Sequence, residues 1–304
     1  MGVMSKIRTM RNAISQLGAQ RVQWERIQIL QGKTLAGNNA RRDDVRELRE
    51  VEFSVFSQWG DDGIIQFLVD RLHLTCRTFV EFGVADYRES NTRFLVINNN
   101  WRGLVMDGST ANIRAITQAE YFWRYELVAQ HAFIDCDNVN DLISEQGFTG
   151  EIGLLHIDID GNDYWVWKAI TVIEPAIVIM EYNSVFGPER AITVPYRRDF
   201  DRTRAHFSTL YAGASLSALQ GLASEKGYVF LGCNSAGNNA YFIQKRRMTD
   251  ELMALANQFK WEASKFRESR DLEGNPSLIG GAGRLKMIRG LPVFNTKTGG
   301  CEKL

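Results

Sequence analysis

Apolar positions recur along this chain as short continuous runs that alternate with stretches of helical periodicity. The runs predict strands at residues 78–82, 103–106, 126–128, 132–134, 153–157, 176–180, 228–232 and 239–244. The stretches between them predict helices at residues 61–72, 91–99, from 110 onward, 139–143, 164–170 and 215–226. Continuous apolar strands separated by helices indicate a parallel sheet that is buried on both faces.

The last two predicted strands flank a turn rich in asparagine and glycine at residues 234–238, which predicts an antiparallel hairpin at the sheet edge. The expected fold is therefore a Rossmann-like, doubly wound α/β sheet, mostly parallel, with an antiparallel C-terminal edge hairpin and helical N- and C-terminal extensions. We expect three parts: a helical N-terminal arm at 1–50, the sheet domain at 51–246, and a C-terminal extension at 247–304. The extension is expected to hold a helix over 249–270 and a loose polar tail.

The N-terminal arm is polar and basic, with ten basic and five acidic side chains in its 50 residues. Ile7, Met10, Ile14 and Leu17 recur at helical spacing. Three interpretations fit this pattern: a solvated helix packed on its own domain, an arm that forms a homo-oligomer or docks a partner, and an arm that binds an acidic surface.

Composition and charge reduce the number of functional classes to which the chain can belong. The 304 residues hold 36 basic and 36 acidic side chains, and a balanced charge argues against a general nucleic-acid binder. Four well-separated cysteines without close pairs favour free thiols in a reducing, cytoplasmic setting. Neither a signal peptide nor an apolar run long enough to span a membrane is recognised in the sequence.

The strongest local motif begins at the end of the first predicted strand, with Glu81-Phe-Gly83 followed by Ser90 and Asn91. Gly83 allows a sharp turn over the strand end, and Glu81 needs hydrogen-bond donors because it lies in an apolar strand. Asp107 ends the next strand 24 residues later, a position suited to the hydroxyls of a ribose. The full GxGxxG pattern is missing, which counts against NAD and FAD.

Acidic residues also follow the third predicted strand. Asp135 or Asp137 can accept the exocyclic amine of an adenine, and the alternative is that they solvate the loop and cap the helix at 139–143.

A dense acidic segment follows the fourth strand. His156 and Asp158 share one strand face, and Asp160 and Asp163 lie just beyond. Glu181 and Asn183 end the fifth strand, which brings them beside Asp158 if these two strands are neighbours. Asp158, Glu181 and Asn183 then offer oxygen ligands to Mg²⁺, whereas the competing interpretation makes Asp158 or Asp160 a general base. His156 is either a catalytic residue or a buried histidine of the strand whose ring nitrogens are hydrogen-bonded within the protein.

These motifs together resemble class I S-adenosylmethionine-dependent methyltransferases, specifically the FkbM-like family, over residues 55–245. The family's strand-Asp-x-Glu-Gly-x-Glu segment is similar to Asp158-Ile-Asp160-Gly161-Asn-Asp163, and its Glu-x-Gly turn is similar to Glu81-Phe-Gly83. Residues 57–63 resemble the Ser-Gln-x-Gly-x-Asp-Gly segment, here called the lead-in, that often precedes the first helix in this family. This sequence departs from the family pattern at residues 86–89, where the family often has a second glycine.

The resemblance implies methyl transfer from S-adenosylmethionine to an oxygen of a carbohydrate or small-molecule acceptor. Glu81, Gly83 and Asp107 would hold the cofactor, while Asp158 and Asp160 would face the acceptor. A second hypothesis, motivated by the bulky turn at 86–89, is a non-catalytic adenosine-nucleoside-binding or scaffold protein with the same fold. An NAD-dependent nucleotide-sugar enzyme is a third.

Overall fold

Seven strands form the central sheet of the computed structural model, which describes residues 3–259, 261 and 263–304. The strands are β1 (Thr78–Phe82), β2 (Arg102–Asp107), β3 (Leu127–His131), β4 (Gly150–Ile157), β5 (Ile173–Glu181), β7 (Tyr228–Cys233) and β8 (Asn239–Gln244). Their order is β3-β2-β1-β4-β5-β8-β7. The first five are parallel, and β8 runs antiparallel to both of its neighbours. The mostly parallel Rossmann-like sheet is confirmed, with the reversed strand β8 lying inside the edge strand β7.

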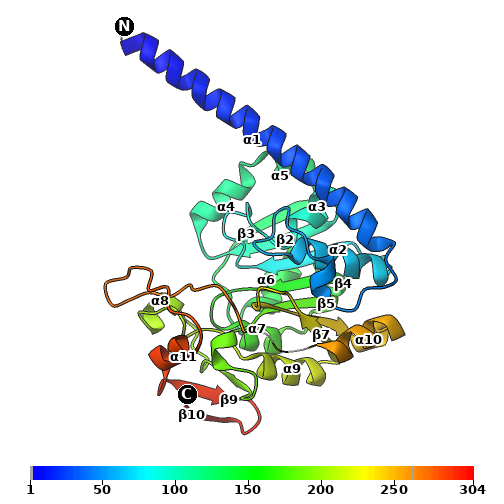
Figure 1. The fold of residues 1–304 in the computed structure, drawn as a ribbon, viewed down its shortest axis with the longest axis vertical. Coiled ribbons are helices and arrows are strands. Elements are labelled where there is room, and N and C mark those ends of the chain that lie inside the picture. The colour runs from blue at the N-terminus through cyan, green and yellow to red at the C-terminus, as the bar shows by residue number, and fades with distance from the viewer. Residues whose placement is uncertain (1–2, 260, 262) are drawn as a thin grey trace.

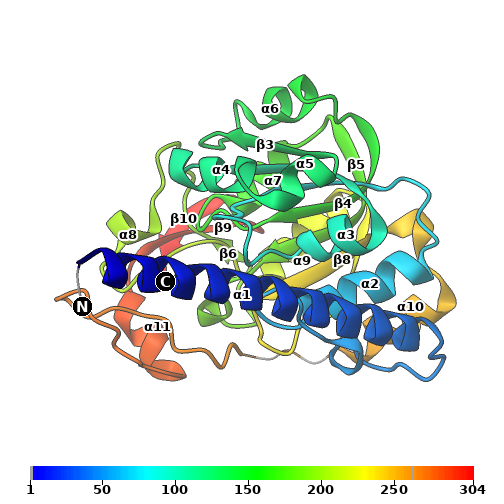
Figure 2. The ribbon, with the colours of Figure 1, turned by 90° about the horizontal axis from the view of Figure 1, so that it is seen from above.

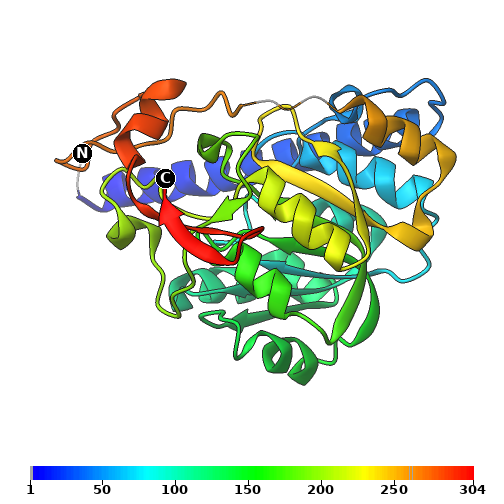
Figure 3. The same cartoon turned by 90° about the horizontal axis from the view of Figure 1, so that it is seen from below.

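Helices cover both faces of this sheet (Figures 1 and 3). One face carries α2 (Asp61–Arg71), α3 (Arg93–Asn99), α4 (Thr110–Thr117), α5 (Glu120–Arg124), α10 (Asp250–Gln258) and the 3₁₀ helix η1 (Leu48–Val51). The other face carries α6 (Val139–Glu145), α7 (Asp163–Ala169) and α9 (Leu216–Glu225). Alternate strand residues serve the two cores: Phe79 packs with the first group, and Val80 and Phe82 pack with the second.

The N-terminal helix α1 (Val3–Ala40) projects from the body of the molecule (Figure 1), and Figure 2 shows the same helix from above. Its C-terminal part approaches the body closely, because a Cβ on Gly32 would lie 2.5 Å from Val55 Cγ2. Glu25 pairs with Arg93 of α3 at 2.7 Å. The arm predicted over residues 1–50 is thus helical from residue 3 to residue 40, and positions 1 and 2 lie outside the described part. None of the described helices is both long enough and apolar enough to cross a bilayer.

A second, three-stranded sheet corrects the prediction for the C-terminal extension. Its strands are β6 (Ile192–Thr193), β9 (Pro292–Asn295) and β10 (Gly300–Lys303), in the order β10-β9-β6. It packs with α11 (Ala282–Ile288) around a separate apolar cluster that includes Phe200 and Val293. The polar tail is therefore a hairpin, whose turn uses Gly299 at φ 73°.

The helix predicted over 249–270 is also wrong in its second half, since α10 ends at Gln258. Aromatic contacts favour the irregular path that follows: Phe259 packs edge-on against Phe230, and Phe266 stacks on Trp59 at 5.8 Å. Likewise, the two strands predicted at 126–128 and 132–134 are one strand, β3, followed by irregular chain. The remaining elements are η2 (Ser184–Phe186), η3 (Lys245–Arg247) and α8 (Arg202–Ala205).

Candidate functional site

A pocket of about 430 Å³ lies at the carboxyl ends of β1, β2, β4 and β5. This volume is in the range of small-molecule sites, and open α/β sheets bind ligands at this edge. One end of the pocket has Asp107 beside apolar groups of the irregular chain after β3, including Phe133 and Ile134. The other end has Asp158, Asp160 and Glu181.

Gly83 forms the floor of the pocket where β1 ends. Its φ is +75°, and a Cβ at this position would lie 1.6 Å from the carbonyl oxygen of Asp158. The glycine is therefore needed for the close approach of two strand ends. The chain then turns so that the Ala85 backbone N–H donates to Asp107 Oδ2 at 2.8 Å.

Asp107 holds three local hydrogen bonds. Besides the one from Ala85, its Oδ1 accepts from Ser109 N and from Asn112 Nδ2, both at 2.8 Å. A carboxylate has about four lone-pair sites, so roughly one is left for a ligand hydroxyl. The sequence suggested that this carboxylate could accept both hydroxyls of a ribose, and the structure leaves room for about one.

Glu81 is buried beneath the pocket floor in a polar network. Its carboxylate accepts hydrogen bonds from Ser90 Oγ at 2.8 Å, from Asn91 N at 3.1 Å and from Thr92 Oγ1, and it pairs with His156 Nδ1 at 2.9 Å. Burial alone would raise the pKa of Glu81, but the hydrogen bond and charge of His156 and the two hydroxyls outweigh it and leave this pKa lowered. The network fastens the loop after β1 to β4.

His156 belongs to this buried network. Burial lowers its pKa, but the carboxylate of Glu81 outweighs burial and leaves the pKa raised. Its Nε2 lies 3.1 Å from Asn91 Nδ2. Glu81, Ser90, Asn91 and His156 therefore form one buried network. The sequence assigned the first three to the cofactor and left His156 as a catalytic or a hydrogen-bonded strand histidine, and none of the four lines the pocket.

Asp158, Asp160 and Glu181 form a carboxylate cluster in which one oxygen of each lies within 4.8 Å of the others. Burial, followed by the charge of Asp160, raises the pKa of Asp158 to about 7. Burial and the charge of Asp158 raise the pKa of Glu181 well above its ordinary value. Glu181 also hydrogen-bonds to Asp158, so this pair holds a proton near neutral pH.

Arg202 of α8 is the counter-ion of the cluster. It pairs with Asp160 and, at 3.1 Å, with Glu268 of the C-terminal extension. Asp160 itself has a left-handed conformation with φ 57° in the turn after β4, and it lines the pocket. The carboxylates thus face a side-chain cation from a different part of the chain.

No protein-family model matches this sequence, and no curated protein matches it. Three solved structures show a remote likeness. The N-terminal domain of EvdMO1 with SAH bound has a TM-score of 0.40 at 11% identity, over 62% of this chain and 81% of that one. The CurJ carbon methyltransferase has a TM-score of 0.41 at 13% identity, over 65% of this chain and 57% of that one.

The third is an O-methyltransferase from Bacillus cereus in complex with SAH, with a TM-score of 0.39 at 13% identity, over 71% of this chain and 89% of that one. At such scores these likenesses identify no family for this chain.

Two predicted site residues, Asn183 and Asp135, are engaged elsewhere, and so is Asp163 of the acidic segment after β4. Asn183 accepts a hydrogen bond from Val185 N and donates to the carbonyls of Leu210 and Ala212, so its amide serves the backbone and not the carboxylate cluster. Asp163 binds the N–H groups of Ile159 and Gly161 at 2.8 Å and clamps the loop after β4.

Asp135 accepts from the N–H groups of Asp137 and Asn138 and pairs with Arg198 at 2.8 Å. It is 2% exposed and does not line the pocket, whereas its neighbours Phe133 and Ile134 do. Its carboxylate holds the turn that precedes α6 and pairs with Arg198, so it neither solvates the loop nor caps that helix.

The lead-in at 57–63 proves to be a structural clamp. Asp62 Oδ2 accepts hydrogen bonds from the N–H groups of Val55, Phe56 and Ser57, at 2.7 to 2.8 Å. Asp61 accepts from Asn234 and Asn239 near the β7–β8 turn. The clamp joins both ends of the sheet domain and places Gln58 in the pocket wall.

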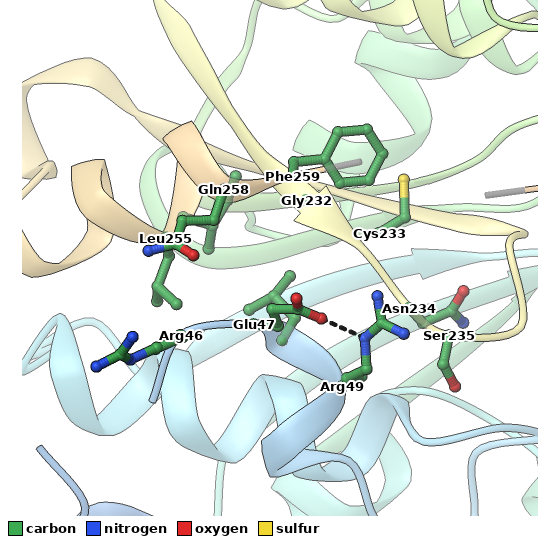
Figure 4. A pocket seen from close by; sticks show the side chains of 12 residues that line it. Arg46, Glu47, Arg49, Gly232, Cys233, Asn234, Ser235, Leu255, Gln258 and Phe259 are labelled. Atoms are coloured by element: carbon green, nitrogen blue, oxygen red, sulfur yellow. Dashed lines mark ion pairs between the residues drawn. The ribbon is translucent and has the colours of Figure 1, made fainter. Parts of the chain in front are cut away.

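Sequence reasoning missed Arg202 and Glu268. The arginines at 197 and 198, just before α8, were a usable signal for Arg202. Glu268 was assigned to the second half of the helix predicted over 249–270, where the structure has irregular chain. A separate small pocket of about 40 Å³ lies between η1, β7 and α10, where Glu47 pairs with Arg49 (Figure 4). It shares no lining residue with the pocket at the carboxyl edge.

Proposed function

We propose that this chain is an S-adenosylmethionine-dependent methyltransferase of FkbM-like type that methylates a hydroxyl of a carbohydrate or small molecule. The observation that carries the proposal is that the two ends of the 430 Å³ pocket differ. The end at Asp107 suits a nucleoside, and the end at Asp158 can accept a proton. The residues fit the cofactor, because Asp107 keeps one acceptor site toward the pocket and the apolar groups of Phe133 and Ile134 lie next to it.

S-adenosylmethionine, when bound, supplies an electrophilic methyl group on its sulfonium. The chain supplies alignment and a base. Asp158 accepts the proton of the acceptor hydroxyl, because its pKa of about 7 leaves it basic near neutral pH. Arg202 pairs with Asp160 beside it, and Glu181 shares the proton held by the pair of Asp158 and Glu181.

A cation-assisted version of the same reaction is supported by the spacing of the carboxylate oxygens. Asp158, Asp160 and Glu181 offer three oxygen ligands of the kind Mg²⁺ prefers, and this set replaces Asn183 by Asp160. Dialysis against EDTA followed by a rate measurement separates the two versions. Full activity after dialysis without added metal supports the version in which Asp158 acts as the base alone. Activity that returns only when Mg²⁺ is added supports the cation-assisted version.

Calorimetric titration with S-adenosylmethionine and S-adenosylhomocysteine tests the proposal first. A micromolar Kd, followed by transfer of a labelled methyl group to a compound in a panel of sugars and small hydroxyl compounds, is the expected result. Absence of binding contradicts the proposal. Binding without transfer to any acceptor favours the non-catalytic nucleoside-binding alternative.

A further inference from the structure

Arg284 of α11 is a buried cation without a carboxylate partner. It is 6% exposed, and its Nη1 donates to Ser264 Oγ at 2.7 Å and to the carbonyl of Phe266 at 3.3 Å. Its Nε has no hydrogen-bond partner, and no carboxylate of the described residues lies within ion-pair distance. Burial lowers the pKa of Arg284 below its ordinary value.

A buried charge that lacks a counter-ion destabilises a fold, often by several kcal/mol. The half-buried arginine at this edge, Arg202, has two carboxylate partners. Among the described residues, Arg284 by contrast has no carboxylate in ion-pair contact, and the charge of Glu268, which acts on it from a greater distance, already pairs with Arg202. A ligand is a natural source of a closer counter-charge.

A cavity of about 50 Å³ lies beside Arg284. A water molecule needs roughly 10–15 Å³ on this measure, so the cavity has room for about four heavy atoms, the size of a phosphate or carboxylate group. Ser264 also lines it. The Oγ of Ser264 accepts from both Ser184 Oγ at 2.6 Å and Arg284, so its own proton remains available to donate.

The cavity continues the proposed acceptor side of the large pocket. The two share Asp160, Glu181, Arg202 and Glu268 as common walls. A molecule that places a negatively charged group at Arg284 can extend past these walls toward Asp158.

We propose that Arg284 and Ser264 bind an oxyanion group, such as a phosphate, sulfate or carboxylate, carried by the methyl acceptor. The guanidinium fork supplies the charge and paired donors that such a group requires, and the Ser264 hydroxyl supplies a further donor. The acceptor is then an anionic hydroxyl compound. That last step rests on the proposed function, whereas the oxyanion site can be tested without it.

The test measures thermal unfolding of the full chain in rising inorganic phosphate, with chloride keeping the ionic strength constant. The wild-type Tm should rise by about 2 °C at saturating phosphate. Arg284→Met should begin with a higher Tm, because it removes an unpaired buried charge, and should show no phosphate shift. Arg289→Met, an exposed change at the end of the same helix, should behave as the wild type.

An equal phosphate shift in the wild type and Arg284→Met overturns the proposal, and so does the absence of a shift in the wild type. Should Arg284→Met fail to fold, Arg284→Lys is measured instead. Lysine carries the same charge without the paired donors of the guanidinium, so this variant should keep less than half of the phosphate-induced rise in Tm. Trp59, stacked on Phe266 near Arg284, reports the same titration by fluorescence.

Titration of the same variants with S-adenosylmethionine keeps the two proposals apart. The Kd of Arg284→Met for S-adenosylmethionine should stay within twofold of the wild type. Failure of every variant to bind S-adenosylmethionine contradicts the proposed function, and leaves the phosphate result to decide on the oxyanion site.

Discussion

Carboxylates with the same chemistry behave differently at this sheet edge because their neighbours differ. Glu81 is fully buried, yet hydroxyl donors and His156 lower its pKa. Asp158 has mainly other carboxylates around it, and its pKa rises to about 7. The first group is thus fixed as an anion that organises a loop, whereas the second can exchange a proton during a reaction.

Replacement of Asp107 by alanine should weaken S-adenosylmethionine binding by about 1–3 kcal/mol, a roughly 5- to 150-fold increase in Kd, because a ligand hydroxyl loses its acceptor. Calorimetric titration measures the change. Asp141→Ala, which removes an exposed carboxylate on α6, is the matched control and should bind as the wild type. An unchanged Kd for Asp107→Ala would show that Asp107 is not a cofactor ligand.

Substitution of Asp158 by asparagine should lower kcat by about 10²–10⁴-fold and leave the S-adenosylmethionine Kd nearly intact, since the base is lost but the nucleoside end is not. The base must be deprotonated, so the wild-type kcat should rise with pH and level off above about 7. Rate profiles from pH 5.5 to 9 check this. Equal losses in rate and cofactor affinity would instead indicate a structural role.

At the scale of elements, the junction of β1 and β4 determines the shape of the pocket. Gly83 sits against the carbonyl of Asp158, and the residues of the following loop are tied to β4 through Glu81 and His156. A change at this junction therefore affects both ends of the pocket together.

Gly83→Ala should reduce the free energy of unfolding by about 3 kcal/mol or more, because a Cβ would overlap the Asp158 carbonyl and the residue would keep a positive φ. Gly108→Ala is the control: it lies just after β2, and its new Cβ would come no nearer than 3.9 Å to Phe133. Urea unfolding compares the two. Similar small losses in both variants would contradict the close approach.

Most elements of the main sheet could be predicted because their strands contain continuous apolar runs, and the residues that end β1, β2, β4 and β5 then meet at one edge. The run of β3 is interrupted by Gln130 and His131, and its bounds were missed. The second sheet could not, since β6 has two residues and β9 and β10 have four each, too few to show a period. Arg202 and Glu268 were missed for a related reason: they reach the cluster from elements that sequence periodicity does not reveal.

At the scale of the whole molecule, buried acids make stability depend on pH. Burial raises the pKa of Asp62 to about 6, although three backbone N–H groups bind its carboxylate. A carboxyl with a raised pKa in the folded state binds more protons there than in the unfolded chain between its two pKa values. The free energy of unfolding therefore falls as pH rises through that window.

Asp62→Asn removes this titration. The stability of the wild type relative to Asp62→Asn should fall by up to about 3 kcal/mol from pH 4 to pH 7.5, the equivalent of a rise in pKa from 3.8 to about 6. Urea unfolding of both proteins across this range measures it. Parallel stability curves for the two proteins would show that Asp62 has an ordinary pKa in the folded state.

The pairing of β6 with β9 has a consequence for biosynthesis. All strands of the large sheet precede residue 245, whereas β9 and β10 leave the ribosome only after residues 292–303 have been added. Chains fold from their N-terminal parts during translation. The nucleoside end can thus assemble on the nascent polypeptide while the wall around Arg202 and Arg284 is still incomplete, so the protein should gain cofactor affinity before it gains selectivity for its acceptor.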